Sequence, residues 1–113
     1  MTWTITYYDS YLQEEILAMP PGFLGRYLRY ADRMEIYGPD LGMPHTRSMG
    51  EGIFELRLKS IEGIARVFYC TIVGQKIVML HQFIKKTDKT PPRELEKARR
   101  RMKEFKNAHS QRT

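Results

Sequence analysis

The chain has 113 residues and a formal net charge of +6 at pH 7, with 42% hydrophobic and 28% charged residues. This length predicts one domain around one hydrophobic core, and the composition is ordinary for a globular protein. No stretch approaches the roughly 20 apolar residues of a membrane span, and the N-terminus lacks the pattern of a secretory signal. We therefore expect a single cytoplasmic domain over residues 1–113, with a frayed tail at 108–113.

Cysteine and histidine are scarce, which limits metal and disulfide chemistry. The chain has one cysteine, Cys70, and three histidines, His45, His81 and His109. One cysteine cannot form a disulfide within the chain, and the histidines lack the spacing of metal ligands. Cys70 is expected to be a buried thiol rather than a nucleophile. These observations predict a reducing compartment, no metal and no cofactor.

The positive charge is concentrated near the C-terminus. Residues 85–113 hold eleven Lys or Arg against four Asp or Glu, whereas residues 1–84 hold eight against nine. Such a segment is either a solvated basic helix and tail or a surface for an acidic partner, such as nucleic acid or an acidic protein.

The N-terminal third predicts a strand and two helices. Apolar and polar residues alternate over residues 3–8, which indicates a strand. Asp9-Ser10 offers a helix N-cap, and Ser10 with Gln13 fits a capping box, so a first helix is expected over about 10–19. A second helix is expected over 23–37, where apolar side chains recur on one helical face.

The remainder predicts a loop, three strands and a helix. Residues 40–52, rich in Gly and Pro, are expected to form the loop. The last helix should begin at Pro91 with Thr90 as its N-cap, since proline suits the first helical position. Antiparallel strands are expected at 53–58, 64–69 and 77–84. The order β-α-α-β-β-β-α predicts an α+β fold, in which two N-terminal helices and a C-terminal helix accompany an antiparallel sheet.

Basic residues gather on the three predicted strands. Arg57 lies on the first, Arg66 on the second, and Lys85 and Lys86 follow the third. Neighbouring strands could bring these four cations onto one surface of the sheet and its end, where they would stabilise negative charge on a phosphate. Each also has an ordinary interpretation. Arg57 could pair with Glu55 as a solvent-facing residue, and both lysines could simply leave the edge of the sheet.

Five segments of the chain resemble segments of a known protein family: Tyr37–Pro44, Met49–Arg57, Gly63–Tyr69, Leu80–Thr87 and Lys89–Pro91. In this order and spacing, they resemble the RelE/ParE superfamily of bacterial toxin–antitoxin toxins, and within it the HigB-type, phage-derived toxins. The resemblance covers about residues 3 to 105 and implies a RelE-like fold.

The resemblance implies an activity and partners. It implies a ribosome-dependent mRNA endoribonuclease, acting without metal or other cofactor, in which a 2′-hydroxyl attacks its adjacent phosphate. It also implies a cognate antitoxin of the helix-turn-helix type, encoded in a neighbouring gene, with the ribosome and mRNA as further partners and no membrane. Arg57 and Arg66 match the two arginines of the family's strands, and Lys85 and Lys86 match the positive end of its fourth strand.

Further residues are candidates with two interpretations each. His81 becomes a candidate base if it shares a face with Lys85, and is otherwise a hydrogen-bonded core residue. Lys59 and Lys89 are expected to position substrate. Tyr69 could stack on a base or lie in the core. Alternative functions are a gyrase inhibitor related to ParE and a basic nucleic-acid-binding module without catalysis.

Overall fold

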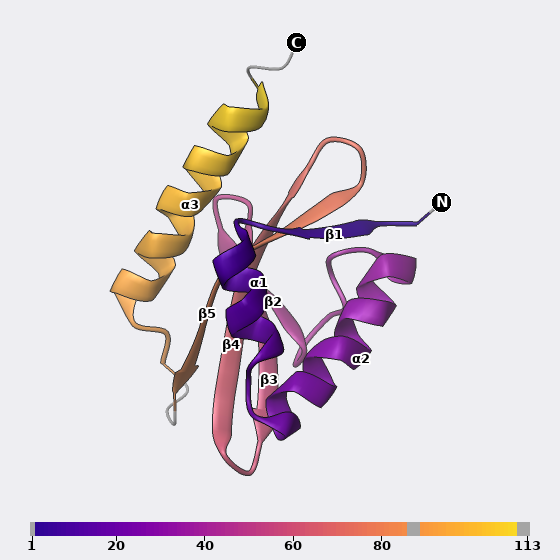
Figure 1. Cartoon of the computed structure of the whole chain (residues 1–113), viewed down its shortest axis with the longest axis vertical. Helices are drawn as coiled ribbons and strands as arrows, with labels where there is room; N and C mark the ends of the chain where they lie inside the picture. Colours follow the sequence, from indigo (N-terminus) through magenta and orange to yellow (C-terminus); the bar gives the residue numbers. More distant parts are fainter. Residues whose placement is uncertain (1, 86–88, 111–113) are drawn as a thin grey trace.

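The computed structural model describes residues 2–85 and 89–110 and confirms the α+β class (Figure 1). Within these residues the chain forms three helices and a five-stranded mixed sheet. In chain order the elements are β1 (Thr4–Tyr7), α1 (Ser10–Leu17), α2 (Pro21–Tyr37), β2 (Thr46–Gly50), β3 (Ile53–Ser60), β4 (Gly63–Ile72), β5 (Lys76–Lys85) and α3 (Pro92–Ser110).

The sheet has the strand order β1-β5-β4-β3-β2. Strands β2 to β5 form the antiparallel part, as expected for β3 to β5. The prediction of a wholly antiparallel sheet is wrong at β1, which runs parallel to β5. Most of the chain separates these two strands, so no hairpin turn fixes their relative direction.

Strand β2 lies within the segment predicted as a loop. It pairs with β3 in a register that sets Arg47 opposite Glu55, and this register shifts between Ser48 and Gly50. The strand is short and polar and lies at the edge of the sheet. Its sequence therefore lacks the alternation of apolar residues that would have indicated a strand.

The observed helix caps match the predicted ones in part. The side chain of Asp9, rather than Ser10, caps α1 by accepting the backbone N–H of Leu12 at 2.8 Å. Helix α3 begins at Pro92, one residue later than predicted, so Thr90 is not its N-cap. The helix continues through Ser110, beyond the point where we expected fraying. The remaining tail residues lie outside the described part of the chain.

The sheet separates two apolar layers. Helices α1 and α2 pack on one face, and α3 packs on the other (Figure 1). On the α3 face, the partly buried side chains of Leu95, Met102 and Phe105 and the buried Ala98 pack against residues of the sheet. We call this side of the sheet the α3 face. The sheet residues in that layer are Ile53, Phe68, Cys70, Val78, Leu80 and Phe83.

A β-bulge in β5 determines which residues point toward α3. Phe68 pairs with His81, but Tyr69 pairs with Met79, which leaves Leu80 as an extra residue in β5. An odd insertion reverses the alternation of side chains along a strand. Residues on both sides of the bulge therefore point to the α3 face: Val78, Leu80, His81, Phe83 and Lys85.

Tyr69 points to the opposite face and lies in the core. Its side chain is fully buried, its ring stacks on Phe54, and its hydroxyl donates a hydrogen bond to the carbonyl of Pro39. Burial raises the pKa of Tyr69 well above its ordinary value. The structure thus corrects the expectation that Tyr69 binds substrate and supports the core interpretation.

The hydrogen bond of Tyr69 predicts a cost for its loss. Tyr69→Phe should lower the free energy of unfolding by about 1–2 kcal/mol, because the carbonyl of Pro39 loses its partner. Urea denaturation would measure this change. Tyr37→Phe, at an exposed position of α2, is the matched control and should change stability by less than about 0.5 kcal/mol. Equal stabilities for the two variants would contradict the prediction.

Candidate active site

Three predicted cations share the α3 face. Arg57 lies directly opposite Arg66 in the β3–β4 ladder, and Arg66 lies opposite Phe83 in the β4–β5 ladder. Two residues before Arg66 in β4, Ile64 pairs with Lys59 of β3 on one side and with Lys85 of β5 on the other. Cross-strand partners point to the same side of a sheet, so the expected convergence of Arg57, Arg66 and Lys85 on one face is confirmed.

A single carboxylate links the arginines. Glu55 Oε1 lies 3.4 Å from Arg47 Nη2 and 4.0 Å from Arg57 Nε. Glu55 Oε2 lies 3.5 Å from Arg66 Nε and accepts a hydrogen bond from the hydroxyl of Thr90 at 2.9 Å. We call Glu55 with Arg47, Arg57 and Arg66 the arginine cluster. Three guanidinium groups around one carboxylate leave a formal excess of two positive charges.

The arginines of the cluster differ in exposure. The side chain of Arg66 is 0% exposed, whereas those of Arg57 and Arg47 are 21% and 42% exposed. Arg66 Nη1 donates a hydrogen bond to the backbone carbonyl of Lys89 at 3.3 Å, and its guanidinium lies 5.9 Å from the centre of the Phe83 ring. An anion at the surface would therefore meet Arg57 and Arg47 directly, with Arg66 as a buried charge beside Arg57.

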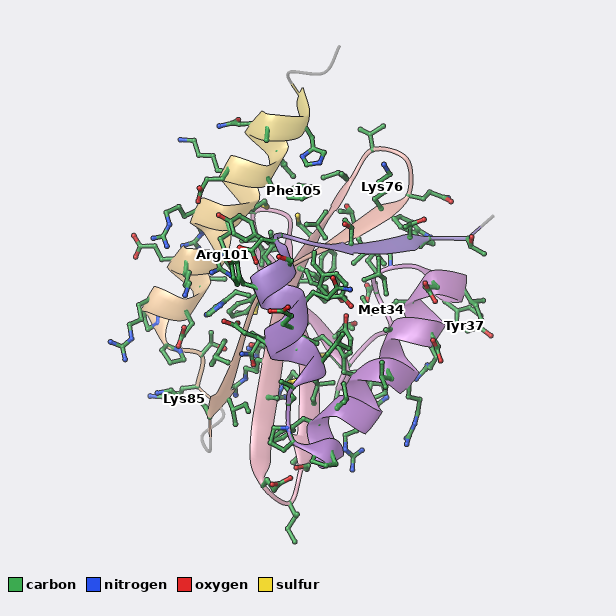
Figure 2. The ribbon with its side chains drawn as sticks, in the orientation of Figure 1. Met34, Tyr37, Lys76, Lys85, Arg101 and Phe105 are labelled. Carbon is green, nitrogen blue, oxygen red and sulfur yellow. The ribbon has the colours of Figure 1, made fainter. Side chains whose placement is uncertain are left out.

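Lysines surround the cluster. Lys59 and Lys89 are exposed, and Lys85 is half-buried at the end of β5 (Figure 2). Lys59 lies two residues beyond Arg57 on the same face of β3. The backbone carbonyl of Lys89 contacts the cluster by accepting the hydrogen bond from Arg66. Lys86 lies outside the described residues. Lys59, Lys85 and Lys89 stay candidates for contacts with an anion.

His81 shares the α3 face with Lys85 but is buried under the start of α3. Its Nε2 lies 2.8 Å from Glu94 Oε1, and its ring stacks on Phe83. Burial lowers the pKa of His81, and the neighbouring Glu94 carboxylate partly opposes this shift. Within the described chain, its buried Nδ1 has no hydrogen-bond partner. This conformation favours the interpretation of His81 as a hydrogen-bonded core residue over that of a base.

The other two histidines lie elsewhere. The ring of His45 packs against Tyr30 of α2, although the backbone carbonyl of His45 accepts the N–H of Arg57 at 2.9 Å. His109 packs on Phe105 near the end of α3. Among the described residues, no group of three or more His, Cys, Asp or Glu side chains is arranged to hold a metal ion. Burial raises the pKa of the Cys70 thiol to about 11, which fits a structural thiol.

Sequence reasoning missed three residues of this region. Glu55 was recognised as sharing a face with Arg57, but its burial and its central place were not predicted. Arg47 was missed because β2 was not predicted. Thr90 was assigned to a helix cap, yet its hydroxyl binds Glu55. The one available signal was the face that Glu55 and Arg57 share through the alternation of β3.

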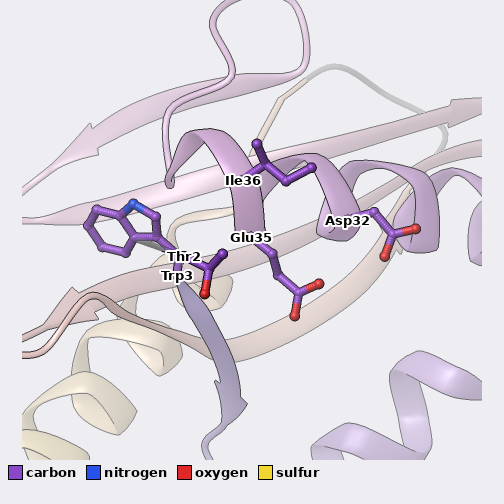
Figure 3. Close-up of a pocket in the computed structure, with 5 residues that line it drawn as sticks. All are labelled: Thr2, Trp3, Asp32, Glu35 and Ile36. Atoms are coloured by element: carbon purple, nitrogen blue, oxygen red, sulfur yellow. The ribbon is translucent and has the colours of Figure 1, made fainter.

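A separate cavity of about 410 Å³ lies between the N-terminal segment and the last turns of α2 (Figure 3). Two exposed carboxylates, Asp32 and Glu35, contribute to its lining, together with Thr2, Trp3 and Ile36. None of these residues belongs to the arginine cluster, and the carboxylates would repel a polyanion.

No helix in the described part of the chain is long and apolar enough to cross a membrane.

The order of the helices and strands in this α+β fold roughly matches the RelE-like fold. Residues 14–103 match a family model described as "Phage derived protein Gp49-like (DUF891)". The match spans most of the chain, and the chain belongs to this family, which is a RelE-like toxin family. A search of curated proteins found no match.

The buried ion pair predicts a strong dependence of stability on Glu55. Glu55→Gln keeps the shape but removes the charge that compensates the buried guanidinium of Arg66, so the free energy of unfolding should fall by about 3–5 kcal/mol. Urea denaturation followed by circular dichroism would measure the change. Glu15→Gln, at an exposed site of α1, should stay within about 0.5 kcal/mol of the wild type. A similarly small effect at Glu55 would show that the pair does not stabilise the fold.

The lowered pKa of His81 predicts a pH dependence of stability. Between the folded pKa and the unfolded value near 6.5, the unfolded chain binds more protons, so stability falls as pH decreases through this window. Urea denaturation at pH 7.5, 6.5 and about 5.5 should show a smaller loss for His81→Gln than for the wild type. His109→Gln is the control on α3 and should keep the wild-type dependence. Parallel curves for His81→Gln and wild type would refute this role.

Proposed function

We propose that this protein is a HigB-type toxin that cleaves mRNA in a ribosome-dependent manner and thereby inhibits translation. The observation that carries the proposal is the partly exposed guanidinium of Arg57 on the α3 face, which it shares with Arg66, Lys59 and Lys85. Family membership supports the toxin assignment. Under this proposal the partners are mRNA on the ribosome and a helix-turn-helix antitoxin encoded in a neighbouring gene.

The proposed reaction uses the substrate's own nucleophile. The 2′-oxygen forms a bond to the adjacent phosphorus while the bond from phosphorus to the 5′-oxygen breaks. The 2′-hydroxyl loses its proton to a base, and the departing 5′-oxygen receives one from an acid. Negative charge builds on the non-bridging oxygens of the phosphorane, which is where a preorganised guanidinium is most effective. Arg57 is placed to supply it.

The remaining candidates differ in access to such a substrate. Lys85 is half-buried at the end of β5 and is the better candidate for proton transfer, because His81 is buried and bonded to Glu94. Lys59 and Lys89 are exposed and suit contacts with the flanking backbone. Arg66 contributes its charge from a buried position beside Arg57 and pairs with Glu55. Lys86 stays a candidate on the basis of the resemblance alone.

The proposal predicts that Arg57 is required for toxicity. On induction in bacterial cells, Arg57→Ala should abolish growth arrest and reduce mRNA cleavage by about 10²- to 10³-fold, because one charge-stabilising donor is lost. Mapping of mRNA 5′ ends after brief induction measures the cleavage. Arg29→Ala, the same change at an exposed site of α2, should stay toxic, and so should the core variant Tyr69→Phe if it folds.

Two outcomes would contradict the proposal. Full toxicity of a folded Arg57→Ala protein would remove Arg57 from the mechanism. DNA breaks and an SOS response with intact mRNA would instead indicate a gyrase inhibitor. Arg66→Ala is a less informative variant, because removing this buried side chain also perturbs the packing around Glu55. Its activity should be interpreted only beside a measured unfolding curve.

A further inference from the structure

Arg47 occupies the open side of the arginine cluster. It lies on β2, the strand at the edge of the sheet, directly opposite Glu55. Its side chain is 42% exposed, the largest exposure among the three arginines of the cluster. It shares the Oε1 atom of Glu55 with Arg57, whereas Oε2 is directed to the buried Arg66 and to Thr90.

The contact between Arg47 and Glu55 leaves much of the guanidinium available. Charge-assisted hydrogen bonds between guanidinium and carboxylate groups are typically about 2.7–2.9 Å long and often bidentate. The guanidinium of Arg47 instead makes one long contact of 3.4 Å through Nη2, and it makes no other hydrogen bond within the described chain. A guanidinium has five N–H donors, so Arg47 can bind an anion without leaving Glu55.

The cations form a track across the α3 face. Lys85 lies at the end of β5, Arg57 follows in the middle of β3, and Arg47 lies at the β2 edge. Arg47 and Arg57 are diagonal neighbours on adjacent strands, a relation that places Cα atoms about 7–8 Å apart. A polyanion bound at Arg57 would therefore meet Arg47 next if its backbone continued toward the edge of the sheet.

We propose that Arg47 is a substrate-binding residue that contacts a backbone phosphate flanking the scissile phosphate of the RNA. The inference rests on the proposed function and extends the site to the edge strand β2. Since the contact is made to phosphate, it carries no base preference. The ordinary alternative is an exposed ion pair with Glu55, which contributes little to stability and nothing to RNA binding.

Binding to an RNA that cannot be cut tests Arg47 separately from the chemistry. An mRNA with 2′-O-methyl groups in the decoding region lacks the attacking hydroxyl and can be loaded on ribosomes. Affinities of wild type, Arg47→Ala and Arg47→Lys for this complex would be measured between about 50 and 200 mM salt. Arg33→Ala, an exposed arginine on α2, is the matched control.

Arg47→Ala should weaken binding about tenfold and reduce the slope of log affinity against log salt by about one, whereas Arg47→Lys should keep the slope. With cleavable mRNA, Arg47→Ala should raise KM and change kcat little.

The inference would be overturned if Arg47→Ala kept the affinity and the salt slope of the wild type while Arg57→Ala lost binding. That result would leave the proposed function intact. If wild type bound but did not cut unmodified mRNA, the proposed function would fail and the role of Arg47 in binding would stand. Absence of wild-type binding would refute both.

Discussion

The buried ion pair between Glu55 and Arg66 determines the geometry of the whole cationic surface. Arg57 and Arg66 lie opposite one another on adjacent strands, an arrangement of like charges that is unfavourable without a counter-charge. Glu55 supplies that counter-charge from the same face of β3, with no exposure to water. Burying such a pair costs desolvation free energy, so its presence is better explained by the positions it imposes than by stability.

The same pair connects the sheet to the segment that precedes α3. Thr90 donates to Glu55, and the carbonyl of Lys89 accepts from Arg66, so both partners of the ion pair also bind this segment. A few residues later, Glu94 in the first turn of α3 binds His81 of β5. The start of α3 is thereby fixed over one end of the α3 face.

The local pattern of apolar and polar residues predicted most of the helices and strands. It could not predict which distant strands pair with one another. The pairing of Arg57 with Glu55 on β3 was anticipated, and the last helix was predicted to begin within one residue of its observed start. The parallel pairing of β1, the edge strand β2 and the bulge at Leu80 depend on partners distant in sequence or on backbone hydrogen bonds. Arg47 was missed for that reason. The burial of Arg66 was missed because a charged residue gives no periodic signal of its environment.

The charge of the cluster fits a transition state better than a ground state under the proposed function. A phosphodiester carries one negative charge, and the phosphorane formed by attack of the 2′-oxygen carries additional charge on its non-bridging oxygens. The side chain of Arg66 lies beside Arg57 and is buried in a region of low dielectric. Its attraction therefore grows as charge develops on the phosphate, without any reorganisation of the arginines. The carboxylate of Glu55 opposes this attraction in both states, so its contribution under the proposed function is to hold the arginines in position.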